Sequence, residues 1–331
     1  MTALMRAVEI SEPGGPEVLQ LVERPVPVPG PEEICIAVAA AGVNGADLAQ
    51  RRGAYPPPQG ASDLPGLEVA GTVHTLGEGV SGFEIGERVC ALLTGGGYAQ
   101  YCVVPKDHVL PLPSNIDLVE GAGLIETAAT VWANVFEAGR LVKGETLIVH
   151  GGAGGIGTTA IQLAKALGAK VIVTCSGPEK AARCQALGAD RAIDYRSEDF
   201  TDVLRNEFGG ADVVLDIIGG PYLEGNIKAL KPGGRLVFIA FGGGRHGQLD
   251  IARVMMNGLT LTGSTLRSRS LAEKARLLAE VKAWIWPLLE TGQFKPIIDS
   301  RWPLEQAADA HRHIESKLHF GKVILTISDS G

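Results

Sequence analysis

The stretch His150-Gly151-Gly152-Ala153-Gly154-Gly155-Ile156-Gly157 decides how the rest of this chain is interpreted. It contains the pattern G-x-G-x-x-G. Residues 146–149 before it form an apolar run typical of a buried strand, and residues 156–167 after it have the periodicity of an amphipathic helix. A glycine turn in this context lets the backbone approach a pyrophosphate, whose charge the free N–H groups and the helix dipole stabilise. The alternative is a loop that only packs helix on strand. We predict a dinucleotide-binding turn formed by Gly152, Gly154, Gly155, Ile156 and Gly157.

The next strand, residues 170–174, indicates which dinucleotide binds. An acidic residue about 20 positions after the glycine turn usually holds the ribose of NAD, but no acid occurs at the end of this strand. Ser176 supplies a hydroxyl there, and Lys180 supplies a nearby cation, which suits the 2′-phosphate of NADP(H). Tyr195 is a candidate to stack over or bond that phosphate. The alternatives are a solvated lysine and a plain surface tyrosine.

Apolar runs alternate with helical segments from residue 126 to residue 263. Strands separated by helices are typical of a parallel sheet with crossover helices. We therefore predict a doubly wound, Rossmann-type sheet in this region. Its further strands are expected at 191–195, 212–217, 235–241 and 259–263, and its further helices at 178–187, 222–230 and 249–257.

The two ends of the chain have a different pattern. Residues 1–125 contain short alternating segments, such as 34–38 and 98–103, separated by proline clusters, which predicts a partly open β-barrel. Residues 264–331 are too short for an independent domain, so we expect them to return and complete the first region. The predicted chain is thus an α/β protein with two domains. One is formed by residues 1–125 plus 264–331, and the dinucleotide-binding domain, 126–263, is inserted into it.

Composition limits the function classes. The 331 residues suit about two domains. The formal net charge of −7 and the pI of about 5.6, without a basic block, argue against nucleic-acid or acidic-membrane partners. No apolar run is long enough to span a bilayer, and the first ten residues lack a signal peptide's apolar stretch. The five scattered cysteines are typical of reduced thiols. We expect a cytoplasmic protein that acts on a small molecule.

Several further motifs occur in a fixed order along the chain. They are AAGVNGAD (40–47), GLEVAG (66–71), GERV (86–89), LRSR (266–269) and GKV (321–323), with the glycine turn between the third and the fourth. Together they resemble the zinc-independent quinone oxidoreductases of the medium-chain dehydrogenase/reductase superfamily over essentially the whole chain. The stretches RRGAYPPP (51–58) and LLTGGG (92–97) are most similar to the p53-inducible branch of that family.

The resemblance implies a GroES-like barrel domain around a Rossmann domain, NADPH as hydride donor, and a homodimer or homotetramer. It also implies a set of residues near the cofactor. By position in the sequence, these residues are Asn44, Thr130, Ser176, Lys180, Tyr195, Ile218, Phe241, Leu266, Arg267 and Ser268.

The same resemblance bears on metal content. Zinc alcohol dehydrogenases of this superfamily hold a catalytic metal with Cys and His ligands, and such a site needs about three protein ligands. Here Asn44 stands where the first cysteine is expected, Leu67 replaces the histidine of Gly-His-Glu, and Glu126 lies near the third ligand. Leucine cannot coordinate, so we predict no metal. His311 and His313, on an expected C-terminal helix, are predicted to be surface residues.

Without a metal to polarise an alcohol, reduction of an already electrophilic acceptor is favoured. A quinone that accepts hydride becomes a stabilised phenolate, and an enone spreads the charge into an enolate. Asn44 and Tyr55 are the candidate catalytic residues, because an amide or a phenol can support a developing oxyanion. Their alternatives are a turn-stabilising asparagine and a tyrosine packed on prolines. We predict an NADPH-dependent quinone reductase; the alternatives are an NADPH-dependent 2-alkenal or enone reductase, and a non-catalytic NADPH-binding protein.

Overall fold

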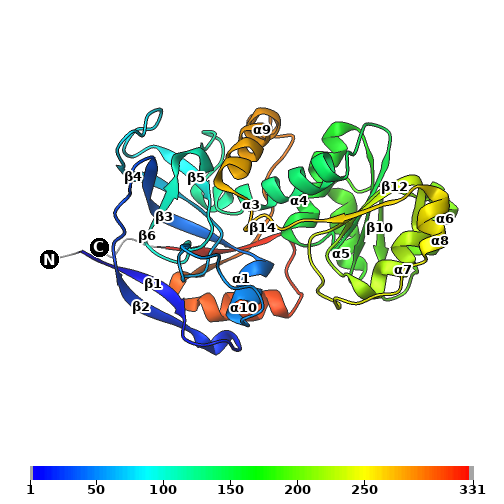
Figure 1. Cartoon of the computed structure of the whole chain (residues 1–331), viewed down its shortest axis with the longest axis horizontal. Helices are drawn as coiled ribbons and strands as arrows, with labels where there is room; N and C mark the ends of the chain where they lie inside the picture. Colours follow the sequence, from blue (N-terminus) through cyan, green and yellow to red (C-terminus); the bar gives the residue numbers. More distant parts are fainter. Residues whose placement is uncertain (1–2, 328–331) are drawn as a thin grey trace. The chain divides into compact units, whose positions relative to one another are not determined.

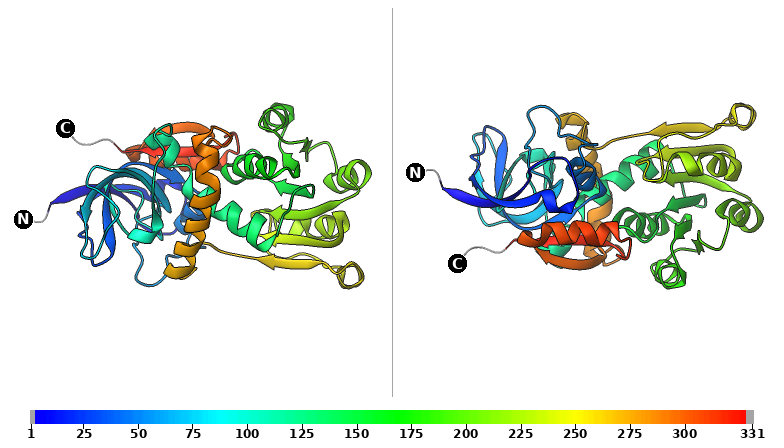
Figure 2. Two further views of the ribbon diagram at one scale, coloured as in Figure 1. Left: turned by 90° about the horizontal axis from the view of Figure 1, so that it is seen from above. Right: turned by 90° about the horizontal axis from the view of Figure 1, so that it is seen from below.

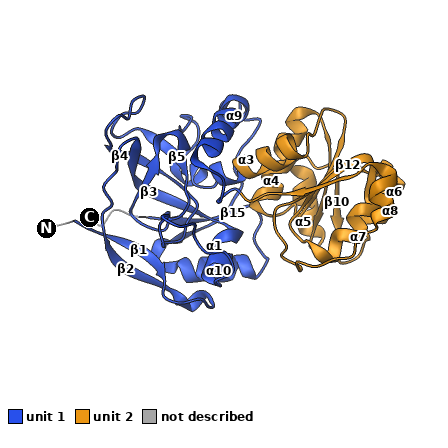
Figure 3. Ribbon diagram, in the orientation of Figure 1, with its two compact units in different colours: residues 1–127, 266–331 blue, residues 128–265 orange. Residues whose placement is uncertain are grey.

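The computed structural model describes residues 3–327 and divides the chain into two compact units (Figure 3). Unit 1 contains both ends of the chain, Met1–Thr127 and Leu266–Gly331, and unit 2 is the middle segment, Ala128–Thr265. The predicted α/β fold class, a barrel-like domain with an inserted parallel sheet, is confirmed.

Unit 2 is built on a six-stranded parallel sheet with the order β10-β9-β8-β11-β12-β13. Its first strand, β8, lies in the middle, and the chain proceeds outward on one side before it returns to β8 and continues on the other. This is the order 3-2-1-4-5-6 of a Rossmann fold, in which ligands bind where the order reverses. The strands are β8 (Thr146–His150), β9 (Lys170–Cys175), β10 (Arg191–Asp194), β11 (Ala211–Asp216), β12 (Leu230–Phe238) and β13 (Thr260–Gly263).

The helices of unit 2 connect these strands (Figure 1). Helix α4 (Gly155–Leu167) buries Ala160 and Leu163 of its predicted apolar face, and also Ile161, while Ile156 and Leu167 of that face are half-buried. The helix α3 (Ile125–Val131) contains the boundary between the units and continues as a π-helix, η3 (Trp132–Ala138). The others are α5 (Pro178–Ala186), α6 (Phe200–Phe208), α7 (Gly220–Ala229) and α8 (Ile251–Asn257).

Unit 1 is a mostly antiparallel barrel-like sheet centred on the long strand β3 (Glu33–Val43). The order is β14-β15-β3-β4-β5-β7, with β6 also paired to β3. The last strand of the chain pairs with residues 40–43 of β3, and Figure 2 shows this C-terminal segment lying against the N-terminal strands. The other strands of this sheet are β4 (Glu68–Leu76), β5 (Arg88–Leu92), β6 (Tyr101–Pro105), β7 (Val109–Pro111), β14 (Ile298–Pro303) and β15 (Lys322–Thr326). Strands β1 (Leu4–Ile10) and β2 (Leu19–Pro25) pair with each other in a separate two-stranded sheet.

Helices of unit 1 place side chains around this sheet. They are α1 (Gly45–Arg51), α2 (Leu118–Gly121), α9 (Leu271–Glu290) and α10 (Ala307–Glu315), with 3-10 turns η1 (Pro16–Val18), η2 (Lys106–His108) and η4 (Leu304–Gln306). Within residues 3–327, no helix has the length and apolar character needed to cross a membrane.

Three elements differ from the sequence-based expectation. Helix α6 was not predicted, although Asp199 caps it by accepting the Thr201 N–H (2.7 Å) and its buried residues Phe200 and Leu204 have helical spacing. The segment expected at 98–103 becomes a strand only from Tyr101, since its first residues make a single bridge with β1. Strand β12 ends at Phe238, which places Phe241 in the loop after it.

Candidate functional site

The glycine turn follows the C-terminal end of β8, where the strand order of unit 2 reverses. Its glycines serve different purposes. A Cβ on Gly152 would lie 2.5 Å from the Cβ of Val173, and one on Gly157 would lie 2.4 Å from the carbonyl oxygen of Gly151. A Cβ on Gly154 would find its nearest atom 3.7 Å away. Gly152 and Gly157 thus permit close packing of the turn, whereas Gly154 faces open space.

Gly154 is also the N-cap of α4, and no side chain caps this helix. The N–H groups of the first turn of a helix have no intrahelical partners. Together with the helix dipole they attract an anion. The open space at Gly154 lets a phosphate reach them, so the turn fits the pyrophosphate of a dinucleotide.

A buried chain of hydrogen bonds holds this turn from behind. The Gly151 N–H donates to Thr174 Oγ1 (3.3 Å), and the Thr174 hydroxyl donates to His150 Nδ1 (3.1 Å). The Nε2–H of His150 donates to Asn226 Oδ1 (2.7 Å). These directions require a neutral imidazole with its proton on Nε2. Burial favours the same state, because it lowers the pKa of His150.

The chain continues from Asn226 to the end of β11. Asn226 Nδ2 donates to Asp216 Oδ2 (2.9 Å), while Asp216 Oδ1 accepts the backbone N–H groups of Ile218 (2.5 Å) and Gly219 (3.1 Å). Asp216 is fully buried and serves as a structural anchor. The glycine turn and the predicted cofactor residue Ile218 are therefore held in one hydrogen-bonded network.

The structure adds two groups beside the predicted ribose-phosphate residues. Ser176 and Lys180 are half-buried, and Tyr195 is 43% exposed. Asp194, at the end of β10, accepts the backbone N–H of Arg196 (3.1 Å) and also that of Gly177, contacts that lower the pKa of its carboxyl. The Arg196 guanidinium lies 3.8 Å from where a Cβ on Gly177 would be. Sequence reasoning missed Arg196, although its position just after a predicted strand end was a usable signal.

The other predicted cofactor residues are divided between the units. Thr130 is buried and Phe241 is 57% exposed in unit 2, where the Arg245 guanidinium lies 5.3 Å from the Phe241 ring centroid. Cofactor contact by these residues stays a prediction. The predicted residues in unit 1 are Asn44, Tyr55, Leu266, Arg267 and Ser268.

In unit 1, Asn44 belongs to a buried ion cluster with Glu68 and Lys322. The ammonium of Lys322 lies 2.6 Å from Glu68 Oε1, 2.7 Å from Asn44 Oδ1 and 3.1 Å from the Val43 carbonyl oxygen. Asn44 Nδ2 donates to Glu68 Oε1 (3.0 Å) and to the Gly42 carbonyl (3.4 Å). The three polar side chains are at most 8% exposed. Both amide N–H groups of Asn44 are therefore committed to the protein.

A second buried chain anchors the start of α1. Arg51 donates to His311 Nδ1 (3.3 Å), His311 Nε2–H donates to the Tyr98 hydroxyl (3.0 Å), and Tyr98 donates to Asp47 Oδ2 (3.3 Å). Asp47 also accepts the backbone N–H of Asn44 (2.8 Å). Burial raises the pKa of Asp47 to about 6, and burial beside the Arg51 guanidinium lowers the pKa of His311 to about 3.

The surface prediction for His311 is therefore wrong. Its side chain is fully buried, because α10 turns this residue toward Tyr98 and Arg51, which come from distant parts of the chain. His313 is partly exposed and bonds Asp299 (2.7 Å).

Tyr55 lies over a buried cation. The Arg267 guanidinium is 5.6 Å from the centroid of the Tyr55 ring, and its Nη1 donates to the Tyr55 carbonyl oxygen (3.3 Å). Its Nε donates to the Thr94 carbonyl oxygen (2.8 Å). Arg267 thus joins the loop that carries Tyr55 to the glycine-rich loop after β5.

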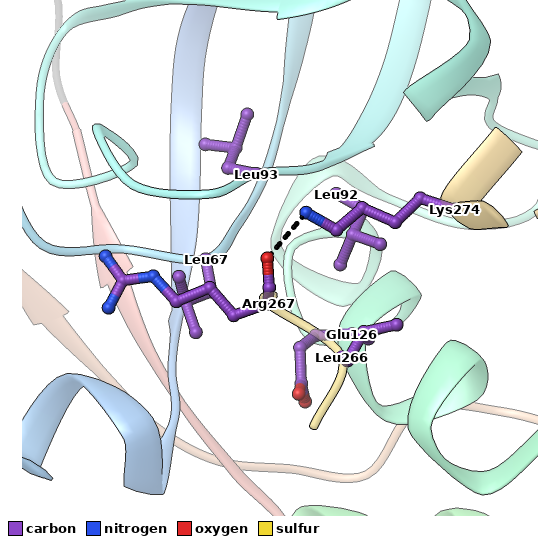
Figure 4. A pocket seen from close by; sticks show the side chains of 7 residues that line it. All are labelled: Leu67, Leu92, Leu93, Glu126, Leu266, Arg267 and Lys274. Atoms are coloured by element: carbon purple, nitrogen blue, oxygen red, sulfur yellow. Dashed lines mark hydrogen bonds between the residues drawn. The ribbon is translucent and has the colours of Figure 1, made fainter. Parts of the chain in front are cut away.

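A small pocket lies in the same unit (Figure 4). It contains about 200 Å³ of empty space, part of it open to solvent. Its walls are the side chains of Leu67, Leu92, Leu93, Glu126, Leu266, Arg267 and Lys274. The lining is mostly leucine, with the charged side chains of Glu126, Arg267 and Lys274 among it.

Comparison with known proteins agrees with this architecture. Residues 30–114 match the alcohol dehydrogenase GroES-like domain, and residues 155–282 match the zinc-binding dehydrogenase family. The quinone oxidoreductase of Rattus norvegicus is 33% identical, with 98% of each chain covered. The structure of Escherichia coli quinone oxidoreductase complexed with NADPH has a TM-score of 0.89 at 30% identity and covers 98% of this chain and 100% of its own. A structure described as an NAD-dependent alcohol dehydrogenase has a TM-score of 0.86 at 34% identity and covers 98% of this chain and 100% of its own.

The Rossmann sheet with its glycine turn, joined to a GroES-like barrel, defines a medium-chain dehydrogenase/reductase, an oxidoreductase that uses NAD(P)H. Within that superfamily, the chain belongs to the quinone oxidoreductase family. The family predicted from the sequence motifs is confirmed.

Proposed function

We propose that this protein reduces quinones with NADPH and transfers hydride without a metal ion. The observation that carries the proposal is the ion cluster of Asn44, Glu68 and Lys322. A lysine ammonium bonds Asn44, which by the sequence resemblance stands at the first zinc-ligand position, and the neighbouring Glu68 carboxylate. An enzyme without a Lewis acid there requires an acceptor that is electrophilic by itself, as a quinone is. The quinone oxidoreductase relatives support the same substrate class.

The residues present do not fit a catalytic zinc, despite the name of the family matched by residues 155–282. Leu67 offers no ligand atom, and the Glu68 carboxylate is bonded to Lys322 and to the backbone N–H of Glu126 (3.0 Å). Among residues 3–327, no group of three or more His, Cys, Asp or Glu side chains is arranged to hold a metal. A divalent ion beside Lys322 would also meet its positive charge.

The residues of unit 2 fit NADPH. Gly154 and the first turn of α4 would hold the pyrophosphate, and Ser176, Lys180 and Arg196 would hold the 2′-phosphate, since a hydroxyl and two cations favour a dianion there. NADPH supplies one hydrogen with two electrons when it is bound. The NADPH-complexed Escherichia coli structure supports this choice of cofactor.

The small pocket of unit 1 is the proposed acceptor site. Its leucine side chains would contact the apolar part of the acceptor, and its charged groups would face the acceptor's oxygen. Tyr55 is kept as a candidate hydrogen-bond donor. Asn44 is assigned a positioning role, because its amide donors are used by Glu68 and Gly42.

Steady-state assays with purified protein test this function. We expect NADPH oxidation with 1,4-benzoquinone to exceed that with a 2-alkenal at equal concentration, and to continue in the presence of a chelator. Faster turnover of the alkenal would favour the enone reductase instead. NADPH binding without turnover of either acceptor would favour a non-catalytic protein, and loss of activity on chelation would contradict the metal-free mechanism.

The variant Lys180→Ala tests the cofactor in the same assay. Loss of one charge-assisted contact should raise the KM for NADPH by roughly 10–100-fold and leave the KM for NADH nearly unchanged. Lys170→Ala, at the exposed opposite end of β9, is the matched control. Equal effects on both cofactors would contradict a 2′-phosphate role.

We further propose a cytoplasmic homo-oligomer, as the family resemblance implies. Supporting observations are the five unpaired cysteines, the terminal position of β13 in its sheet, and the exposed side chains of Ile251, Met255 and Met256 (71–80%) on the neighbouring α8. Light scattering should give a dimer or tetramer mass, and Met256→Asp should lower it. Leu318→Asp, an exposed apolar position in unit 1, is the control. A wild-type monomer at micromolar concentration would contradict the proposal.

A further inference from the structure

The pocket of unit 1 contains two buried cations. Arg267 is 5% exposed and Lys274 is 2% exposed. Within the part of the chain that the structure describes, neither forms an ion pair with a carboxylate. Lys274 Nζ donates to the Arg267 carbonyl oxygen (2.8 Å) and, at 3.4 Å, to Thr94 Oγ1. Since an ammonium carries three N–H groups, one remains for a ligand.

The position of Lys274 is costly for a charged group. Its side chain lies in a pocket whose other walls are mainly leucine, with its ammonium directed at the Arg267 carbonyl oxygen (Figure 4). It also lies in the first turn of α9, where the helix dipole disfavours a cation. Burial and the neighbouring Arg267 guanidinium lower the pKa of Lys274. Burial, the helix dipole and Arg267 all disfavour the charged form of Lys274, so its presence here indicates a function.

We propose that Lys274 is a catalytic residue, the group that binds the acceptor's carbonyl oxygen and protonates it. The inference rests on the proposed function. Once the acceptor has taken up a hydride, its oxygen carries a negative charge. The N–H bond of Lys274 then breaks and an O–H bond forms, which leaves a neutral amine that regains its proton from water. Hydride and proton together complete the two-electron reduction.

The same charge defines the substrate class. The pocket should favour acceptors whose reduced oxygen is a stabilised anion, as in quinones, over acceptors that form a basic alkoxide. Three other ionisable groups face Lys274 or line its pocket: the Arg267 guanidinium, the His108 imidazole on η2, and the Glu126 carboxylate. Arg267 stays charged throughout the accessible pH range.

Three substitutions test the kinetic role. Lys274→Gln keeps hydrogen-bond donors without the charge, and should lower kcat by roughly 100-fold or more while the KM for NADPH stays within about threefold. If Lys274 is the acid, kcat of the wild type should decline at alkaline pH as Lys274 loses its proton. Lys274→Arg keeps the charge but is a poor acid, so its kcat should be low and should not show this decline. Lys282→Gln, an exposed lysine of the same helix, is the matched control. Full activity in Lys274→Gln would overturn the proposal.

A binding measurement without NADPH separates this inference from the proposed function. 4-Nitrophenol is a single-ring mimic of the reduced acceptor, and its absorbance reports its protonation state. The wild-type protein should bind the phenolate in preference to the phenol and so lower the apparent pKa of the bound dye. Lys274→Gln should lose this shift and Lys282→Gln should keep it. Absence of the shift in the wild type, or its persistence in Lys274→Gln, would overturn the role of Lys274 even if quinone turnover is observed.

Discussion

Replacing Lys322 by methionine should lower the free energy of unfolding by about 3–5 kcal/mol. The substitution leaves the Glu68 carboxylate fully buried without its cation, which lies 2.6 Å away in the wild type. It also removes the donor to Asn44 Oδ1. An uncompensated charge in a dry interior costs far more than an exposed ion pair contributes. Urea denaturation followed by circular dichroism measures the change.

A double-mutant cycle identifies the cause of that loss. Glu68→Gln in the Lys322→Met background removes the stranded charge and keeps the size of the side chain. The double variant should therefore be more stable than the sum of the single effects predicts. Lys228→Met is the control, because the Lys228–Glu224 pair is exposed, and the change should be below about 0.5 kcal/mol. A loss below about 1 kcal/mol in Lys322→Met would contradict the buried-pair argument.

The cluster of Asn44, Glu68 and Lys322 also shows why part of the site could not be predicted from the sequence. The GKV motif was recognised as part of a family pattern, but nothing local indicates that Lys322 bonds Asn44, which lies 278 positions away. The contact exists because β15 pairs with residues 40–43 of β3. The burial of His311 has the same origin. Side chains whose environment is made by long-range strand pairing give no periodic signal of their own.

Local signals were sufficient elsewhere. The start of α4 and the strands β8 and β9 were predicted within a residue, because a glycine turn between an apolar strand and an amphipathic helix is defined by adjacent residues. The parallel arrangement of the unit 2 sheet follows from alternating strands and helices, whereas its strand order is a finding of the structure. Helix α6 has a comparable local signal, the Asp199 N-cap followed by Phe200 and Leu204 at helical spacing, and could have been predicted from it.

Alanine substitutions at two glycines of the turn should separate folding from cofactor binding. Gly157→Ala should lower the free energy of unfolding by about 1–3 kcal/mol or more, because its Cβ would lie 2.4–2.5 Å from backbone atoms of Gly151 and Gly152, which cannot move aside. Gly154→Ala should lower the free energy of unfolding by at most about 1 kcal/mol, the usual effect of an alanine at the N-cap. Its Cβ would lie no closer than 3.7 Å to another atom.

For NADPH affinity, measured by nicotinamide fluorescence, Gly154→Ala should have the larger effect and Gly157→Ala the smaller. If the pyrophosphate occupies the space in front of Gly154, a methyl group there keeps it from the N–H groups of α4 and should raise the Kd at least about tenfold, or 1.4 kcal/mol. If the Gly154→Ala protein folds and binds NADPH with wild-type affinity, the phosphate does not bind at this turn. A stable Gly157→Ala protein would contradict the packing role assigned to that glycine. The pair distinguishes a glycine that the fold requires from one that the ligand requires, because only one of the two methyl groups meets protein atoms.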